Sequence, residues 1–460
     1  MWLPDIDRIG GPKYLSISAA LSRDIEAGRL RQGDRLPPQR ELADALGIDL
    51  GTVTRGYAEA RRLGLIDADG RRGSFVREQG AAAPLPEQIA PFDTGMNLPP
   101  LPLRSSLPEC LAADLREILS GPSAANRLQY QPAGSAPLDR QAGADWLALR
   151  GIEANEDTVL VVSGAQTALH AIAHSALEPG DAVCTGNFVY AGWLAVARRR
   201  GLHIVSVGCD DEGVLPGELD RACAAQVIRA VYLVPSNDNP TTATMGAERR
   251  RAIVEVARRH DILIIEDDAY GLLASSPPPP LASLAPERTW HVVSLSKIIS
   301  PSLRVAYLRA PTVRDAWRLS ADVHETTVMA PPLNVGVVSK WLREGTWVDL
   351  VGEVRAECAV RQAMVAEALP AGSYCASPEG YHLWIPLARD IAPAEMVSAL
   401  APSGLLAVPG EAFAANRDAE TQRGIRVSIG GGLSRERLCR ALPLLDALLH
   451  HRGDRAAPLV

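Results

Sequence analysis

The stretch Ser294-Leu295-Ser296-Lys297, which continues as SLSKIISPSLR to Arg304, directly follows an apolar run in this 460-residue sequence. The apolar run predicts a buried strand, so Lys297 lies where that strand ends. A lysine that forms an imine must lose its proton, and a partly desolvated pocket favours that loss. The two serines and the arginine suit a phosphate dianion. Taken alone, the segment is only moderately specific, because a lysine after a buried strand is more often a surface residue.

Acidic residues follow a second apolar run further upstream in the sequence. In ILIIEDDAY, residues 262–270, Asp267 and Tyr270 follow a predicted strand. A buried carboxylate without a partner costs free energy, and these acidic residues have no evident structural reason to be there. The cluster therefore predicts a functional role.

Two loops, each following a predicted strand, add to these two segments. The segment SGAQ, residues 163–166, lies between a β-run and a helix, so backbone N–H groups and the helix dipole would face an anion. The segment NPTT, residues 239–242, follows the apolar run VYLVPS. Each loop alone is a weak signal, and its value comes from its position relative to the other segments.

In this order the four segments resemble the fold-type I enzymes that use pyridoxal 5'-phosphate (PLP), a group that includes aminotransferases. The resemblance implies that Lys297 binds PLP as a Schiff base. It implies that Asp267 keeps the pyridinium nitrogen protonated, so that the ring remains an electron sink, and that Tyr270 and Asn239 hydrogen-bond the ring O3'. Thr242 stands where the family has a glycine, which leaves the geometry of that turn open.

The resemblance assigns further residues to the ring and the phosphate. Either Tyr190 or Phe188 would stack on the ring. Tyr130 would reach the phosphate of the neighbouring subunit, which implies a homodimer, head-to-tail and domain-swapped as in this family. The other cofactor-binding residues predicted near the phosphate are Gly164, Ala165, Gln166, Ser294, Ser296 and Arg304.

An arginine interrupts the apolar run GIRVS near the C-terminus. Arg426 has two interpretations: a structural ion pair, or a bidentate clamp on the carboxylate of an amino-acid ligand. The resemblance favours the clamp. His382 and the turn at 408–413 also occupy family-like positions, but a single histidine beside a strand is more often a core residue.

Residues 1–77 predict a winged helix-turn-helix. Apolar spacing with Gly and Pro boundaries indicates helices at 14–28, 38–46 and 49–64, followed by a small hairpin at 65–76. The stretch GRLRQGDRLPPQRELADALGI resembles the GntR-type winged helix. The residues expected to contact double-stranded operator DNA are Arg40, Thr52, Thr54, Arg55, Arg71 and Arg72.

The start of the predicted recognition helix departs from the GntR pattern. Asp49-Leu50-Gly51 stands where the family often has an arginine and a polar residue. The loss of a cation and the gain of a carboxylate weaken the expected attraction to phosphates. An altered operator preference and a decayed DNA reader both remain open.

The rest of the chain predicts an α/β fold. Residues 92–334 alternate apolar strands with helical patterns, which is typical of a mostly parallel sheet covered by helices on both faces. Residues 335–460 predict a smaller α+β part. The Ala- and Pro-rich stretch at 78–91 predicts a linker between the N-terminal domain and this PLP-binding domain.

Composition limits the function classes. The net charge is −7, and residues 1–79 carry 13 Lys or Arg against 12 Asp or Glu, so DNA binding must come from one region. The seven cysteines form no CxxC pair, which argues against a metal site and fits a reducing cytoplasm. No apolar stretch of 18 residues or more is present, so we expect neither export nor a membrane span.

A GntR-like reader joined to a fold-type I domain resembles the MocR-type transcription regulators over nearly the whole chain. The resemblance implies a PLP-dependent, DNA-binding regulator that senses an amino acid or related amine through aldimine formation at Lys297. The competing interpretation is an aminotransferase with a vestigial helix-turn-helix, because the same pocket can catalyse or sense. A third alternative is a regulator that binds DNA without PLP.

Overall fold

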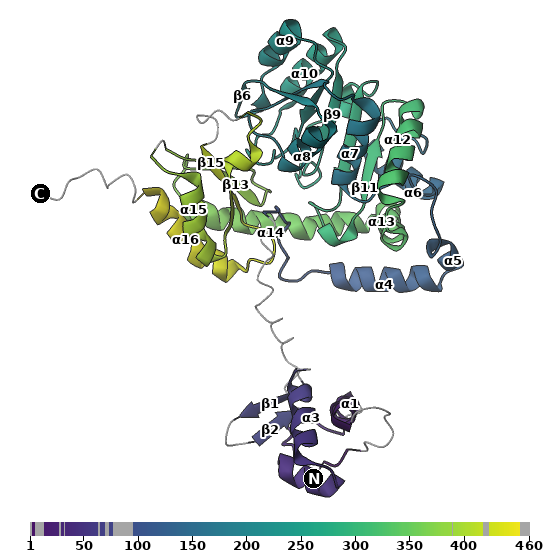
Figure 1. Ribbon diagram of the computed structural model, residues 1–460, viewed down its shortest axis with the longest axis vertical. Coiled ribbons are helices and arrows are strands. Elements are labelled where there is room, and N and C mark those ends of the chain that lie inside the picture. The colour runs from purple at the N-terminus through teal and green to yellow at the C-terminus, as the bar shows by residue number, and fades with distance from the viewer. Residues whose placement is uncertain are drawn as a thin grey trace, which may run out of the picture. The chain divides into compact units, whose positions relative to one another are not determined.

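The computed structural model describes residues 2–4, 13–26, 29–31, 33–62, 65–69, 73–76, 95–388, 390–416 and 423–450. The chain forms two compact units, Met1–Thr94 and Gly95–Val460 (Figure 1). The linker predicted at 78–91 and the wing-tip residues Arg71 and Arg72 lie outside the described residues.

The N-terminal unit is a three-helix domain with an antiparallel hairpin, which confirms the predicted winged helix-turn-helix. Its elements are α1 (Lys13–Glu26), α2 (Gln39–Leu46), α3 (Leu50–Arg62), β1 (Ile66–Asp69) and β2 (Gly73–Val76). Gly47 ends α2 at a φ of 59°, a left-handed backbone that glycine adopts without steric cost. Asp49 accepts a hydrogen bond from the Gly51 N–H at 2.7 Å and so caps the start of α3. The core of this unit includes Ile17, Leu21, Leu36, Leu42, Val53, Tyr57 and Ile66.

A seven-stranded sheet with the order β3-β11-β10-β9-β8-β4-β5 forms the centre of the second unit. Its strands are β3 (Val159–Val162), β4 (Ala182–Thr185), β5 (His203–Ser206), β8 (Ala230–Leu233), β9 (Leu263–Asp267), β10 (Thr289–Ser294) and β11 (Ala306–Arg309). Neighbouring strands run parallel, except that β11 is antiparallel to both β10 and β3. The mostly parallel sheet predicted from the sequence is confirmed.

Strand β11 is an element that the sequence pattern did not predict. The chain reverses after β10 through the short turn η1 (Pro301–Leu303) and Arg304, whose φ of 51° is left-handed. The returning run is only four residues long and ends in an arginine, so it carries little periodicity. The reversal places Lys297 and Arg304 at the same end of β10.

Helices cover both faces of the large sheet. Successive residues of β8 point to opposite faces, because Tyr232 packs in one core cluster and Val231 in another. The first cluster includes residues of α7 (Ala165–Ala176) and α8 (Ala191–Arg200), and the second includes residues of α9 (Pro216–Ala225) and α10 (Ala247–Arg259). The remaining elements of this part are α4 (Leu107–Ser120), α5 (Ala124–Arg127), α6 (Pro137–Ala148), β6 (Cys209–Asp210), β7 (Gly213–Val214), α11 (Leu281–Leu284) and α12 (Val313–Thr327).

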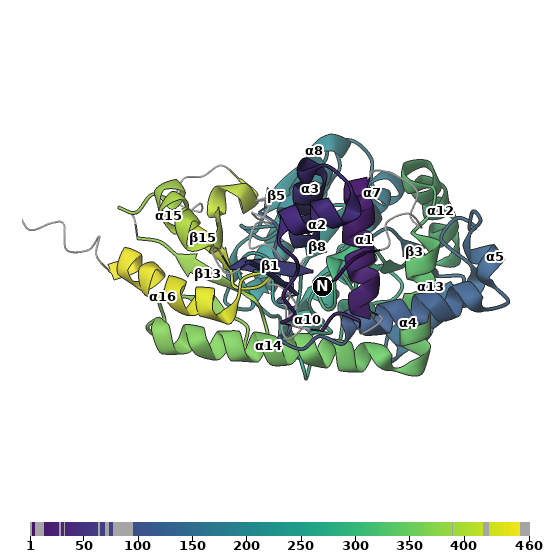
Figure 2. The ribbon, with the colours of Figure 1, turned by 90° about the horizontal axis from the view of Figure 1, so that it is seen from below.

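The C-terminal part is a smaller α+β layer around an antiparallel sheet with the order β12-β13-β15-β14. Its strands are β12 (Cys375–Ala376), β13 (His382–Pro386), β14 (Leu406–Pro409) and β15 (Gly424–Ser428). Its helices are α13 (Pro332–Glu344), α14 (Thr346–Ala368), α15 (Pro393–Leu400), η2 (Ala401–Ser403), η3 (Gly410–Phe413) and α16 (Arg435–His450). The long helix α14 runs lengthwise along one side of the second unit (Figure 2). Within the described ranges, no helix is both long and apolar enough to cross a lipid bilayer.

Candidate functional site

Most of the predicted cofactor residues lie around one cavity at the carboxyl ends of β9 and β10. Of the twelve residues that the sequence assigned to the cofactor, ten line it: Ala165, Gln166, Tyr190, Asn239, Asp267, Tyr270, Ser294, Ser296, Lys297 and Arg304. Gly164 lies beside it, at the start of α7. The large sheet therefore brings together segments that are up to 140 positions apart in the sequence.

Asp267 ends β9 inside this cavity. Its Oδ2 accepts a hydrogen bond from the Tyr232 hydroxyl at 2.8 Å. Its Oδ1 is buried and has no hydrogen-bond partner among the described residues. Burial raises the pKa of the carboxyl to about 6, against the effect of the Tyr232 hydrogen bond. A buried carboxylate oxygen without a protein partner fits a cationic N–H donor such as a pyridinium.

Lys297 follows β10 and is only partly exposed. Its Nζ donates a hydrogen bond to the backbone carbonyl of Asn97 at 2.6 Å. Burial, followed by the positive charge of Arg426, lowers the pKa of this ammonium from 10.5 to about 8. The neutral amine that imine chemistry requires is therefore more accessible here than on a surface lysine.

Asn97 is a residue of this region that the sequence analysis missed. It is 2% exposed, and its Nδ2 lies 3.2 Å from the Tyr270 hydroxyl and 3.1 Å from His382 Nδ1. Its Oδ1 accepts a hydrogen bond from Ser428 Oγ at 2.8 Å. One asparagine in the polar-apolar run GMNLPP carries no motif, so no sequence signal could have selected it.

His382 takes a structural place in this arrangement. Burial lowers its pKa to about 3, so the ring is neutral. Its Nδ1 accepts from Asn97, and its Nε2 donates to the Asp238 backbone carbonyl at 3.0 Å. The histidine thus orients Asn97, which in turn contacts Tyr270.

The start of α7 and Arg304 form a cradle for an anion. Gly164 has a φ of 96°, and a Cβ atom at this position would lie 2.8 Å from Arg304 Nη2. Arg304 donates to the Ser163 backbone carbonyl at 2.7 Å. The Ser296 hydroxyl is buried and lacks a hydrogen-bond partner among the described residues. A helix N-terminus, a guanidinium and an unsatisfied hydroxyl together fit a phosphate dianion.

The structure separates the two aromatic candidates for ring stacking. Tyr190 precedes α8, lines the cavity and donates from its hydroxyl to Gln166 Oε1 at 3.2 Å. Burial raises its pKa to about 12. Phe188 instead packs against Trp384, with ring centroids 4.7 Å apart, and lines a different cavity. Of the two candidates, Tyr190 is therefore the one that lines this cavity.

Arg426 lies on β15 with 2% of its surface exposed. Its Nη1 donates to Asn239 Oδ1 at 3.0 Å, and its Nη2 donates to the Gly95 carbonyl. Among the described residues, its Nε has no hydrogen-bond partner and no acidic side chain pairs with the guanidinium. A buried guanidinium without a carboxylate partner in the protein fits the carboxylate of a ligand. Asn239, which the resemblance assigns to the ring O3', lines the cavity and uses its Oδ1 to accept from Arg426.

Two further predicted positions lie outside the cavity wall. Thr242, in place of the glycine, adopts a φ of 65°, so the turn keeps a left-handed residue despite the side chain. Tyr130 is 81% exposed and does not line the cavity. Its contact with a neighbouring subunit stays a prediction.

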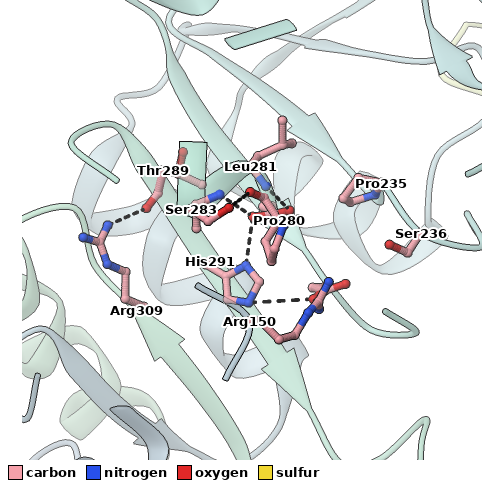
Figure 3. Close-up of polar contacts among 12 residues, drawn as sticks. Arg150, Pro235, Ser236, Pro280, Leu281, Ser283, Thr289, His291 and Arg309 are labelled. Carbon is pink, nitrogen blue, oxygen red and sulfur yellow. Dashed lines mark hydrogen bonds and ion pairs between the residues drawn. The ribbon is translucent and has the colours of Figure 1, made fainter. Parts of the chain in front are cut away.

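The other acidic residues of ILIIEDDAY have structural partners, which corrects the interpretation that they lack a structural reason. Glu266 accepts hydrogen bonds from the Leu281 and Ala282 backbone N–H groups and from His291 Nδ1 at 2.9 Å. Asp268 forms an ion pair with Arg150. Figure 3 shows Arg150 and His291 among these polar contacts, with Pro280 and Leu281 nearby. The Glu266 contacts fix the first residues of α11 to the sheet. Asp267 is therefore the carboxylate of the three that faces the cavity.

The N-terminal unit places the predicted DNA contacts on α2 and α3. Arg40 and Thr54 are exposed, and Thr52 is half-buried. The Thr54 hydroxyl donates to Gln39 Oε1 and to the Leu50 carbonyl, both at 2.9 Å. The Arg55 guanidinium stacks 4.3 Å above the Tyr14 ring, which orients it.

Each of the two units matches a known family model. Residues 95–443 match the aminotransferase class I and II family. Residues 13–76 match the bacterial regulatory proteins of the gntR family.

Curated relatives share both parts. The chain is 29% identical over 450 residues to the uncharacterized HTH-type transcriptional regulator YdeF of Bacillus subtilis, covering 97% of this chain and 96% of the relative. It is 29% identical over 427 residues to the vitamin B6 salvage pathway transcriptional repressor PtsJ of Salmonella typhimurium, covering 92% and 95%. For the HTH-type transcriptional regulator TauR of Rhodobacter capsulatus the identity is 29% over 433 residues, covering 85% and 88%.

Solved structures show the same fold in the second unit. The kynurenine aminotransferase of Pyrococcus horikoshii superposes with a TM-score of 0.70 at 23% identity, over 79% of this chain and 92% of that one. LysN, the α-aminoadipate aminotransferase of Thermus thermophilus, gives 0.68 at 24% identity, over 78% and 93%. The chain therefore belongs to the aminotransferase class I and II family, and it joins that domain to a gntR-type helix-turn-helix in the arrangement of MocR-type regulators.

Proposed function

We propose that this chain is a cytoplasmic, DNA-binding transcription regulator that holds PLP in the cavity at Lys297 and senses an amino acid or related amine there. One observation carries the proposal: the same chain has a gntR-type domain and a cavity lined by Asp267 and Ser296. Each of these two residues has a buried side-chain oxygen without a hydrogen-bond partner among the described residues. The full-length relatives named as transcription regulators support it.

The residues around the cavity fit PLP. Lys297 would attach its aldehyde, Asp267 Oδ1 would pair with its ring nitrogen, and Tyr190 would cover its ring. Gly164, Arg304 and Ser296 would hold its phosphate. Bound in this way, the cofactor supplies a carbonyl that exchanges amines and a ring that accepts electrons. Desolvation of Lys297 keeps its amine available, and the anion cradle fixes the orientation.

The effector has an amine and a carboxylate. Arg426 would bind the carboxylate through two parallel hydrogen bonds, a geometry that guanidinium and carboxylate share. Lys297 would accept or release the proton that accompanies exchange of the amine. The effector would change DNA affinity only if it binds two arrangements of the chain with different affinity. By resemblance, the protein would act as a homodimer.

A PLP-dependent aminotransferase is the second candidate. The catalytic set Asp267, Tyr270 and Lys297 is complete, and Asp49 places a negative charge at the start of the recognition helix. The fold itself is shared with aminotransferases, so it does not discriminate between the two functions.

The deciding experiment is a fluorescence-anisotropy titration of PLP-loaded protein on the DNA upstream of its own gene. Excess unrelated duplex serves as competitor, with and without a pool of amino acids. Competitor-resistant binding that changes with the pool supports the regulator. Binding no tighter than to unrelated DNA, together with sustained keto-acid production from an amino donor, supports the aminotransferase.

A further inference from the structure

Asn97 contacts two residues of the catalytic set, Lys297 and Tyr270. Its backbone carbonyl accepts a hydrogen bond from Lys297 Nζ at 2.6 Å, and its side-chain Nδ2 lies 3.2 Å from the Tyr270 hydroxyl. Lys297 and Tyr270 both line the cavity, whereas Asn97 is 2% exposed and is not part of the cavity wall. Asn97 can therefore act on a ligand only through these neighbours.

His382 decides which end of the Asn97 amide faces Tyr270. Its Nε2 lies 3.0 Å from the Asp238 backbone carbonyl, which can only accept, so Nε2 carries the ring proton. Burial lowers the pKa of the ring to about 3, so Nδ1 has a lone pair and no proton. This lone pair, 3.1 Å from Asn97, needs an N–H group, and a flipped amide would place its oxygen there instead. The amide nitrogen is therefore the atom that faces both His382 and Tyr270.

Ser428 holds the opposite end of the amide. Its Oγ donates to Asn97 Oδ1 at 2.8 Å. Ser428 and His382 lie opposite each other on the neighbouring strands β15 and β13. The small sheet thus fixes the orientation of the amide, and one of its N–H groups remains for Tyr270.

The orientation of the amide sets the direction of the Tyr270 hydroxyl proton. Burial raises the pKa of Tyr270 above its usual 10, so the hydroxyl keeps its proton. Because the Tyr270 oxygen accepts from Asn97, this proton points away from Asn97. Tyr381, whose ring packs edge-on at 5.8 Å from that of Tyr270, donates its own proton to the Lys297 carbonyl at 2.8 Å. Tyr270 is therefore a donor toward any acceptor that enters the cavity.

We infer that Asn97 is a positioning residue for the cofactor: it donates to Tyr270, so that the Tyr270 proton is directed at the ring O3' of PLP. The inference rests on the PLP site of the proposed function and does not require DNA binding. A donor to the Tyr270 oxygen also makes that hydroxyl a stronger donor, because hydrogen bonds in a chain polarise one another. An Asn97 that only ties this segment to β13 and β15 would have no such effect on the ring.

The first measurement is an absorbance titration, against pH, of the imine between Lys297 and PLP. A donor to O3' draws charge from the ring oxygen that stabilises the protonated imine, so it lowers the pKa of the imine. Loss of the Asn97 N–H weakens that donor, and the pKa should rise. In Asn97→Leu, which has a similar volume and no polar group, we expect the acid dissociation constant of the imine to fall about 2- to 10-fold, the range of one hydrogen bond.

Tyr270→Phe shows whether Asn97 acts through Tyr270. In a double-mutant cycle, the effect of Asn97→Leu is measured with Tyr270 present and again together with Tyr270→Phe. We expect the effect of Asn97→Leu to disappear when Tyr270→Phe is present. The same change in both backgrounds, or no change in either, overturns the positioning role.

Asn97→Asp covers the case in which Asn97→Leu does not fold. It keeps the shape of the side chain and can accept from Ser428, but it has no N–H group. Its charge acts on the imine in both backgrounds, so the cycle cancels that contribution. The imine constant should again change more with Tyr270 than with Tyr270→Phe, and equal changes would contradict the inference.

Asn187→Leu is the matched control. Asn187 accepts from Ser206 Oγ at 2.7 Å and lines a different cavity, so its substitution should leave the imine constant unchanged. A change as large as that in Asn97→Leu would mean that the titration reports a general loosening of the unit, and the positioning role would be wrong.

The imine titration and the DNA titration can fail separately. If the cycle shows coupling but DNA binding does not respond to amino acids, the inference stands and the regulator proposal fails. If DNA binding responds while the cycle shows no coupling, the regulator proposal stands and Asn97 is structural. A wild type that forms no imine with PLP overturns the inference together with the PLP part of the proposed function.

Discussion

The Tyr232 hydroxyl donates to Asp267 Oδ2 at 2.8 Å and leaves Oδ1 of the same buried carboxylate without a partner. Tyr232 lies on β8 and Asp267 on the adjacent strand β9, whose register pairs Leu233 with Glu266. One oxygen is fixed by the fold, and the other is directed into the cavity. The pair therefore presents a preoriented acceptor to the proposed pyridinium.

Removing that hydroxyl should weaken cofactor binding. Without the Tyr232 hydrogen bond, the pKa of Asp267 rises further above about 6, so a larger fraction of the carboxyl is protonated near neutral pH. We expect Tyr232→Phe to lose about tenfold in PLP affinity at pH 7, as for a hydrogen bond to a charged group. Equilibrium dialysis from pH 6 to 8 measures the loss, and a profile identical to that of the wild type would contradict it.

Asp267 should also affect stability in the cofactor-free protein. Its folded pKa of about 6 lies above the unfolded value of 3.8, so the folded state binds more protons between these pH values. Its contribution to the unfolding free energy therefore falls as pH rises from about 4 to 6. Urea titrations of cofactor-free wild type and Asp267→Asn over this range should show a steeper decline in the wild type. Parallel curves would refute the assignment.

Lys297 should make cofactor attachment sensitive to pH near neutrality. Its pKa is lowered to about 8, so the reactive neutral amine accumulates as pH rises through that value. The rate of imine formation, followed by its absorbance after mixing with PLP, should rise between pH 6.5 and 8.5 and then level off. Lys297→Ala should show no imine band. A rate that keeps rising to pH 10 would indicate an ordinary lysine.

A side chain at Gly164 should destabilise the protein. At a φ of 96°, a Cβ would sit 2.8 Å from the Arg304 guanidinium, so Gly164→Ala combines backbone strain with a clash in the anion cradle. We expect a loss of about 1–3 kcal/mol in unfolding free energy, with weaker PLP retention.

Gly217→Ala is the control for that substitution, because nothing lies within 4 Å of its Cβ position at the start of α9. Chemical denaturation of both variants compares them directly. If Gly164→Ala were as stable as Gly217→Ala, neither the left-handed backbone at residue 164 nor the close approach of Arg304 would limit stability.

Asp49 should oppose DNA binding while it stabilises α3. Its carboxylate accepts the Gly51 N–H at 2.7 Å. Asn can keep that cap without the charge, so Asp49→Asn should bind DNA more tightly at nearly unchanged stability. Asp49→Ala should lose about 1 kcal/mol of stability. Anisotropy titrations at several salt concentrations, with thermal unfolding alongside, separate the two effects. Unchanged DNA affinity in Asp49→Asn would exclude repulsion by this carboxylate.

Local sequence determined the architecture. The apolar runs that end in Asp267 and Lys297 predicted strands of a mostly parallel sheet, and Gly47 and Pro38 marked the limits of a helix in the N-terminal unit. These predictions need only the spacing of apolar residues and the backbone preferences of Gly and Pro. Both are properties of residues that are close together in the sequence. The order of motifs along the chain was enough to place ten side chains around one cavity.

Tertiary structure alone decided which groups meet. Asn97 contacts Lys297 from 200 positions away, and Arg426 reaches Gly95 across 331. Glu266 follows the same apolar run as Asp267, yet it serves the fold by binding backbone N–H groups. Such pairings depend on how two sheets pack, and packing is set by the whole core. The pattern of residues one to four positions apart, which is all that periodicity reports, contains no information about them.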